Sequence, residues 1–177
     1  MAWVKRGLKM RKLLIGGALG VVLLSVVLVA CTGSGNGSAD EQARLDQDRY
    51  EIDQIEKNFH HATTTKDIAL MMSLYAPNAT MTVGPGVTAS GLDEIRQFWL
   101  EKAATFEPQN HWLSDHPAYK LEITVNGDRG TLHFECHYID IETGDVAYAT
   151  TADFDVARID GTWLITNMVG GTTVLEV

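Results

Sequence analysis

The sequence contains little cysteine and little positive charge. Only two of its 177 residues are cysteine, Cys31 and Cys136, and no Cys-x-x-Cys pair occurs. Packing, rather than a framework of disulfides, must therefore stabilise the fold. The sequence also lacks a Gly-rich phosphate loop and a Gly-x-Ser-x-Gly nucleophile elbow. Its 14 basic residues are outnumbered by 23 acidic ones, and five of the basic residues stand within the first twelve positions.

Residues 1–30 have the organisation of an export signal. Five basic residues and no acidic one precede an apolar run over residues 13–29, and a small polar run from Thr32 to Ser38 follows. Between them, Leu28-Val29-Ala30-Cys31 resembles the bacterial lipobox, whose cysteine sulfur takes a diacylglycerol and becomes the new N-terminus after cleavage. We therefore predict a lipoprotein signal peptide over 1–30, a lipidated (palmitate-bearing) Cys31 and a flexible tether over 31–44.

An uncleaved membrane anchor is the alternative interpretation of this segment. The apolar run is 17 residues long, which reaches the lower limit for spanning the hydrocarbon of a bilayer. A plain anchor does not need a cysteine directly after the run. In either case the remaining chain works outside the cytoplasm, attached to the bacterial cell membrane or outer membrane.

The chain after residue 30 is long enough for one domain and strongly acidic. It has 147 residues, with 9 basic and 23 acidic side chains and hence a net charge of −14. Such a surface repels nucleic acid and anionic lipid headgroups, so neither is expected as a partner. With Cys31 lipidated, Cys136 has no second thiol for an intrachain disulfide. It alternates with apolar residues, which predicts a small buried side chain.

Hydrophobic periodicity predicts three helices followed by strands. The first helix has an apolar stripe of Leu45, Ile52, Ile55, Phe59 and Ala62, with Asp48 and Glu56 expected to face solvent. Asp67 is expected to cap the second helix, and Ser90-Gly91-Leu92-Asp93 is typical of a capping box that opens the third. A short strand over 79–83 lies between them. From Asn110 the period becomes two, with turns at 126–128, 142–145 and 160–162. This order predicts an α+β domain over residues 45–177.

Several local motifs in this order are similar to a known superfamily. They are Leu74-Tyr75-Ala76-Pro77-Asn78-Ala79, Gly91-Leu92-Asp93-Glu94-Ile95-Arg96-Gln97-Phe98-Trp99, Asn110-His111-Trp112-Leu113-Ser114-Asp115, Asn126-Gly127-Asp128 and Asp160-Gly161-Thr162-Trp163-Leu164-Ile165. Between about Tyr50 and Val169 the chain resembles the nuclear transport factor 2-like superfamily, in particular its SnoaL-like branch. The resemblance implies a cone-shaped fold, in which a curved antiparallel sheet packs around three N-terminal helices and leaves an apolar pocket at one end.

The resemblance leaves the function open, because this superfamily includes isomerases, cyclases, dehydratases, epoxide hydrolases and proteins without catalysis. Val83 stands where the ketosteroid isomerases carry their general-base aspartate, and valine cannot take a proton. The resemblance also implies that His111 faces the pocket, where it would act as a general acid/base or only contact a ligand. The other pocket residues that it implies are Tyr75, Met81, Trp99, Leu113, Asp115, Phe134, Tyr138, Tyr148 and Asn167.

Two further histidine motifs have structural alternatives. His133, Glu135 and His137 share one face of a strand, and two histidines at this spacing can bind zinc. The apolar alternation places them on the outside of the sheet, so we predict a solvated or dimer-forming face and no metal. The tandem His60-His61 is expected to complement the dipole at the end of the first helix, or to reach the mouth of the pocket.

Three functions follow from these observations. The first is a membrane-tethered, extracytoplasmic domain that binds a small apolar or amphipathic molecule without a cofactor. The second is a cofactor-independent lyase or isomerase that uses His111 as its acid/base. The third is an interaction module that forms a homodimer through the face of its sheet.

Overall fold

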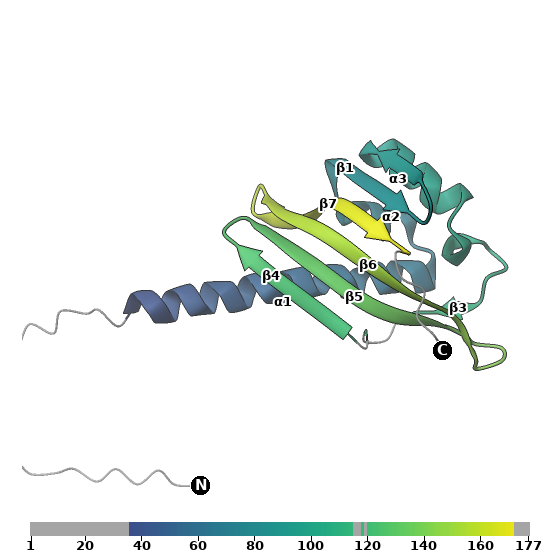
Figure 1. Ribbon diagram of the computed structural model, residues 1–177, viewed down its shortest axis with the longest axis horizontal. Coiled ribbons are helices and arrows are strands. Elements are labelled where there is room, and N and C mark those ends of the chain that lie inside the picture. Colours follow the sequence, from purple (N-terminus) through teal and green to yellow (C-terminus); the bar gives the residue numbers. More distant parts are fainter. Residues whose placement is uncertain (1–35, 115–117, 119, 172–177) are drawn as a thin grey trace, which may run out of the picture. The chain divides into compact units, whose positions relative to one another are not determined.

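The computed structural model describes residues 36–114, 118 and 120–171 (Figure 1). The predicted signal peptide and Cys31 lie outside these residues. The helices are α1 (Asn36–Thr65), α2 (Ile68–Ser73), α3 (Gly91–Glu101) and the 3-10 helix η1 (Ala104–Phe106). The strands are β1 (Tyr75–Val83), β2 (Val87–Ser90), β3 (Trp112–Leu113), β4 (Lys120–Asn126), β5 (Arg129–Asp140), β6 (Val146–Ile159) and β7 (Thr162–Gly170). No helix within the described ranges combines the length and the hydropathy needed to cross a membrane.

The strands form one mixed sheet in the order β2-β1-β7-β6-β5-β3, and β4 also pairs with β5. The predicted α+β class and curved sheet are confirmed, with helices α1 to α3 preceding most of the strands. One detail of the prediction is wrong, because β1 runs parallel to β7 while the other pairs are antiparallel. Strands β1 and β7 are far apart in the sequence, so no hairpin turn constrains their relative direction.

Helix α1 lies against the inner face of the sheet with its apolar stripe. Ile52, Ile55, Phe59 and Ala62 are all buried, as the periodicity predicted. The Phe59 ring lies 5.7 Å from that of Phe134 on β5 and 5.4 Å from that of Phe154 on β6, measured between centroids. These aromatic contacts attach the helix to the middle of the sheet.

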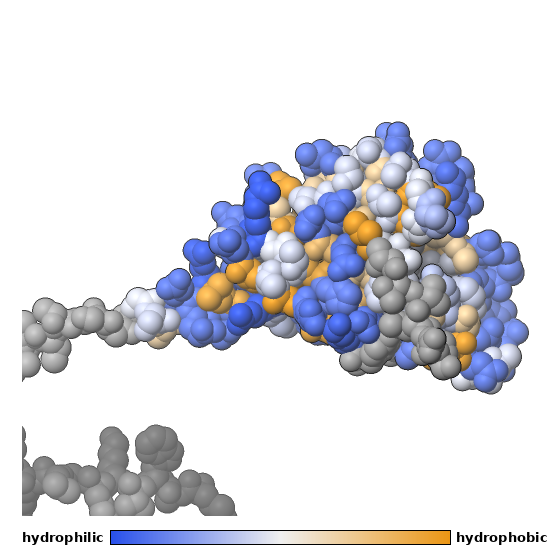
Figure 2. All heavy atoms as spheres, viewed as in Figure 1, coloured by the Kyte–Doolittle hydropathy of each residue, from blue (hydrophilic) through white to orange (hydrophobic). Residues whose placement is uncertain are grey.

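The start of α1 corrects the predicted tether. The helix begins at Asn36, so residues 36–44, expected to be flexible, are helical and extend past the sheet. Residues 39–45 are mostly good helix formers, and Gln42 donates a 2.8 Å hydrogen bond to Asp46 one turn later. Figure 2 shows mainly hydrophilic and neutral residues along this projecting part. Such a solvated helix needs side-chain pairs for its stability, because it packs against little else.

Local capping chemistry was largely predictable. The Asp67 carboxylate accepts a 2.9 Å hydrogen bond from the Leu70 N–H and caps α2. At α3 the predicted capping box is wrong, because the Ser90 side chain makes no capping bond and Glu94, rather than Asp93, accepts from the Ser90 N–H at 2.8 Å. Strand β1 begins at Tyr75, earlier than predicted, since its pairing register shifts between Tyr75 and Thr80 and so accommodates Pro77, which has no N–H to donate.

Two acidic residues of α1 contradict the predicted solvent-facing side of that helix. Asp48 and Glu56 are both buried, on the same stripe as Ile52 and His60 at four-residue spacing. Asp48 forms an ion pair with Arg158 on β6, and Glu56 Oε1 lies 3.2 Å from His60 Nε2. The sequence does not indicate that either residue is buried. The partner of Asp48 is distant in the chain, and the partner of Glu56 is itself a polar residue.

Candidate functional site

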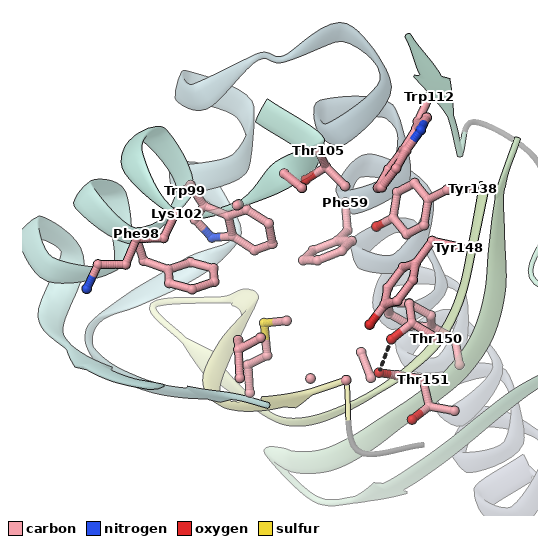
Figure 3. Close-up of a pocket in the computed structure, with 18 residues that line it drawn as sticks. Phe59, Phe98, Trp99, Lys102, Thr105, Trp112, Tyr138, Tyr148, Thr150 and Thr151 are labelled. Atoms are coloured by element: carbon pink, nitrogen blue, oxygen red, sulfur yellow. Dashed lines mark hydrogen bonds between the residues drawn. The ribbon is translucent and has the colours of Figure 1, made fainter. Parts of the chain in front are cut away.

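A cavity of about 260 Å³ lies between α3, η1 and the inner face of β5, β6 and β7 (Figure 3). Its wall is mostly aromatic or small and apolar. The lining residues are Phe59, Val83, Phe98, Trp99, Lys102, Ala103, Ala104, Thr105, Trp112, Phe134, Tyr138, Tyr148, Thr150, Thr151, Ala152, Met168, Gly170 and Gly171. A concave, mainly apolar site with a few hydroxyl groups is the usual form of a small-molecule site.

Aromatic contacts hold two parts of this wall in place. Trp99 of α3 packs edge-on against Phe59 of α1, with ring centroids 5.5 Å apart. Trp112, Tyr138 and Tyr148, from three different strands, form a column in which the Trp112 and Tyr148 rings are nearly parallel and 6.3 Å apart. Tyr148 remains 38% exposed, so this column reaches the mouth of the cavity.

Small residues account for the space inside. Ala152 on β6 and Gly170 at the end of β7 present almost no side chain to the cavity. A Cβ atom added at Gly170 would lie 2.8 Å from the Met168 Cε atom, so a larger residue there would have to displace the Met168 side chain. The volume of the cavity is thus set by particular small side chains rather than by loose packing.

Most polar side-chain groups of the lining residues are hydroxyls, and the others are the indole N–H groups of Trp99 and Trp112 and the Lys102 ammonium. Lys102 is the only side chain in the lining that is charged at neutral pH, and the described lining contains no aspartate, glutamate or histidine. Burial raises the pKa of the Tyr138 phenol, which therefore keeps its proton at neutral pH. The described lining consequently offers hydrogen bonds but no carboxylate or imidazole for proton transfer.

The structure brings four of the predicted pocket residues to this cavity, namely Trp99, Phe134, Tyr138 and Tyr148. Tyr75 and Met81 are buried in the core instead, and the Tyr75 hydroxyl donates to Met168 Sδ at 3.1 Å. Leu113 is half-buried on β3 and does not line the cavity. Asp115 lies outside the described residues.

Asn167 is on the wrong face of the sheet for a pocket residue. It accepts a 2.8 Å hydrogen bond from Thr80 and donates to Asp155 at 3.2 Å, on the outer face. Its neighbour Met168 supplies the inward side chain of β7 and lines the cavity. A shift of one residue along a strand moves a side chain to the opposite face of the sheet. The pairing register between β6 and β7 shifts between Asp155 and Val156, and the sequence does not indicate this shift.

The expectation that His111 faces the cavity is wrong. Its side chain is 49% exposed, and its Nδ1 lies 2.7 Å from Glu142 Oε1 in the turn after β5. The residue comes just before β3, and its carbonyl accepts from the Ile141 N–H, which holds it at the end of the sheet. Because His111 does not line the cavity, it has no basis for an acid/base role there.

The histidines of the other two motifs also lie outside the cavity lining. On the outer face of β5, His133 Nδ1 lies 2.7 Å from Asp153, and Lys120 donates to Glu135 at 2.9 Å. In the described part of the chain, no group of three or more His, Cys, Asp or Glu side chains is arranged to hold a metal ion. His60 is buried next to Phe134, so it is a core residue and not a surface complement to the helix dipole.

Sequence reasoning missed several residues of the lining, among them Lys102, Thr105 and Thr150. Thr150 lies directly opposite Cys136 on the neighbouring strand, so its inward direction follows once the pairing of β5 and β6 is known. Cys136 itself is fully buried, and burial raises the pKa of its thiol to about 12, which makes it an inert core residue as predicted.

A curved sheet that packs on one long helix and leaves an apolar cavity beside a second helix defines a cone-shaped α+β domain with an internal apolar cavity. Residues 46–169 match the family model of the SnoaL-like domain. The chain therefore belongs to the SnoaL-like domain family.

Solved structures of low sequence identity share the fold. An NTF2-like protein with a cystatin-like fold from Novosphingobium aromaticivorans is 15% identical, with a TM-score of 0.67 over 78% of this chain and 90% of that one. A protein of unknown function with a cystatin-like fold from Nostoc punctiforme is 20% identical, with a TM-score of 0.60 over 70% and 90%. A hexachlorocyclohexane dehydrochlorinase from Novosphingobium barchaimii is 16% identical, with a TM-score of 0.60 over 79% and 94%. No curated protein matches the chain.

Proposed function

We propose that this protein is a lipid-anchored, extracytoplasmic domain that binds a small apolar or amphipathic molecule in its internal cavity. The observation that carries the proposal is the cavity of about 260 Å³, which is walled by aromatic and small apolar side chains. Transfer of an apolar molecule from water into such a cavity is favourable, in proportion to the apolar area that the molecule and the cavity wall bury.

Binding is favoured over a lyase or isomerase reaction by the composition of the lining. Proton abstraction needs a base within hydrogen-bonding reach of the substrate, and the described lining has neither a carboxylate nor an imidazole. Val83, at the position of the isomerase base, does line the cavity. The hexachlorocyclohexane dehydrochlorinase shares the fold at 16% identity, which does not transfer its reaction to this chain.

The cavity also argues against a function only as an interaction module. Tyr148 in its wall is 38% exposed, so the space opens to solvent instead of being sealed by its aromatic residues. An open cavity admits a ligand, whereas a domain that served only as a docking surface would gain stability by filling it. A homodimer through the outer sheet face remains compatible with binding in the cavity.

Filling the cavity should abolish binding, which gives a direct test. Ala152 is buried in the wall, so we expect Ala152→Phe to weaken binding of the neutral apolar fluorophore N-phenyl-1-naphthylamine by at least about tenfold, because the new ring occupies its place. Fluorescence titration of the purified protein measures the affinity. Val169→Phe, which adds the same ring on the outer face opposite Asp153, is the control and should bind like wild type. Equal affinity of both variants would exclude the cavity as the site.

The lipid anchor is tested separately at Cys31. The motif Leu28-Val29-Ala30-Cys31 and the small polar residues after it support acylation of the cysteine sulfur. We expect Cys31→Ala to abolish incorporation of radiolabelled palmitate in the producing bacterium, and to prevent removal of the signal peptide or to release the protein from the membrane fraction. Cys136→Ala is the matched control, since that thiol is buried in the domain. Equal labelling of wild type and Cys31→Ala would contradict the lipoprotein assignment.

A further inference from the structure

Part of the cavity wall is a flexible side chain. Met168 on β7 lines the cavity and is 4% exposed. Methionine is unbranched and has three rotatable side-chain bonds, so its thioether adapts to the space around it. A flexible apolar side chain beside an apolar cavity gains van der Waals contacts by turning into it. The open cavity therefore requires that Met168 be held against its own strand.

The first restraint on Met168 is a hydrogen bond from a residue outside the lining. The Tyr75 hydroxyl on β1 donates to Met168 Sδ at 3.1 Å, across 93 positions of the sequence. Tyr75 is 3% exposed, and burial raises the pKa of its phenol, which therefore keeps the hydrogen that it donates. A thioether is a weak acceptor, but a buried hydroxyl that loses its acceptor is costly. Movement of the sulfur into the cavity would take this acceptor away from Tyr75.

The second restraint is the space left by a missing side chain. Gly170 lies two positions after Met168, on the same face of β7, and it also lines the cavity. A Cβ atom at position 170 would lie 2.8 Å from Met168 Cε, so the terminal methyl of Met168 occupies the place of that side chain. Gly170 is not among the glycines with a positive φ. Its backbone therefore accepts alanine, and the Met168 methyl has to move instead.

The cavity is the open space next to a displaced Met168 methyl. The cross-strand neighbours of Met168 are Met81 on β1 and Phe154 on β6, and both are buried. Tyr75 contacts its sulfur. Protein interiors are close-packed, so these sides leave no room for additional atoms. A displaced thioether consequently enters the cavity of about 260 Å³ and reduces its volume.

We propose that Met168 is an adjustable wall of the cavity and that Tyr75 and Gly170 hold it in the open position, so that these three residues set the largest apolar ligand the cavity admits. This inference rests on the proposed binding function and specifies the size of its ligand. The ligand is a molecule large enough to need the space into which Met168 would otherwise turn. Tyr75 acts through Met168 and is a positioning residue, since it does not itself line the cavity.

Two fluorescent amines that differ by one phenyl ring test this size limit, N-phenyl-1-naphthylamine and 1-naphthylamine. The loss of one hydrogen bond corresponds to about fivefold in affinity. We expect Tyr75→Phe and Gly170→Ala each to weaken binding of the larger amine on this order. Binding of 1-naphthylamine should change less than about twofold, because the smaller molecule leaves room for the displaced thioether. Fluorescence titration measures both affinities, and melting curves establish which variants are folded.

A substitution at position 168 shows whether both effects act through this side chain. Met168→Leu keeps a similar volume but removes the sulfur that Tyr75 holds and the methyl that lies over Gly170. In this background, Tyr75→Phe and Gly170→Ala should each change the affinity for the larger amine less than about twofold. Met81→Leu makes the same change at the cross-strand neighbour outside the lining, so in this control background both effects should remain. A merely structural role of Tyr75 would give the same result in the two backgrounds.

A crystal structure of Gly170→Ala without ligand gives an independent measurement. It should show the Met168 methyl inside the cavity, and it carries the test if Tyr75→Phe fails to fold. A Met168 side chain that stays over position 170 would overturn the inference. So would effects of equal size on the two amines, or effects that persist in the Met168→Leu background.

The proposed function and this inference fail in different ways. If N-phenyl-1-naphthylamine binds in an Ala152-sensitive way but Tyr75→Phe and Gly170→Ala bind it like wild type, the inference fails while the proposed function stands. If the wild type binds neither amine, the proposed function fails as well.

Discussion

Replacing Trp163 by alanine is expected to destabilise the domain by about 3–5 kcal/mol, the usual cost of deleting a large buried aromatic side chain. Trp163 is 4% exposed and is part of the core at the start of β7. The guanidinium carbon of Arg158, its cross-strand neighbour, lies 4.8 Å from the indole ring centroid. The variant therefore loses apolar burial and leaves a cavity in the core. It also loses a cation–π contact, which adds to the loss of stability.

Urea unfolding followed by far-UV circular dichroism measures this loss. Trp163→Phe should be much milder, because the indole N–H has no hydrogen-bond partner among the described residues and the phenyl ring retains most of the burial. Tyr50→Ala, at a position that is 58% exposed, should cost less than about 0.5 kcal/mol and serves as the surface control. A loss below about 1 kcal/mol for Trp163→Ala would show that the ring is not packed in the core.

Replacing Arg158 by alanine should be of similar severity, for an electrostatic reason. Asp48 is 1% exposed, and its carboxylate is paired with the Arg158 guanidinium. Arg158 also lies 3.3 Å from the Asp128 carboxylate and 3.7 Å from that of Glu51. Without the guanidinium, a buried negative charge is left unpaired, which typically costs about 3–5 kcal/mol.

A double variant separates the contribution of the charges from that of the packing. Asp48→Leu combined with Arg158→Met removes both charges and should recover most of the stability lost in Arg158→Ala, because a buried ion pair is often replaceable by apolar residues of similar volume. Urea unfolding at neutral pH gives all the free energies. If Arg158→Ala cost no more than a typical exposed ion pair, about 0.2–1 kcal/mol, Asp48 would be solvated instead of buried. The effects of Arg158→Ala and Trp163→Ala should not add, since the two side chains touch.

The behaviour of α1 shows how far periodicity predicts this fold. The stripe of Ile52, Ile55, Phe59 and Ala62 repeats at helical spacing, and each of these residues is buried as predicted. Asp48 and Glu56 lie on the same stripe, but their charge made them appear to be surface residues. Burial of Asp48 depends on Arg158, which is 110 positions away in the sequence, and no local pattern indicates that partner.

The prediction of the candidate site was likewise correct for some residues and wrong for others. The resemblance placed four residues in the wall of the cavity correctly in space, among them Trp99 and Tyr138. It misplaced His111, which binds Glu142 at the end of the sheet, and Asn167, which faces outward. Both errors concern positions where strand pairing begins or shifts register, and there the face that a side chain takes depends on the partner strand.

What the sequence by itself determined is local: the helical stripe, the Asp67 cap, the hairpin turns and the motifs that give the family. These depend on residues within a few positions of each other, so their physics is contained in a short window. Tertiary structure alone decided which small residues leave the cavity open and which polar side chains meet in the core. Those features require contacts between segments that are distant in the sequence, such as the hydrogen bond between Thr63 near the end of α1 and Ser114 just after β3, which are 51 positions apart. No short window of the sequence contains both partners of such a contact, so only the assembled core brings them together.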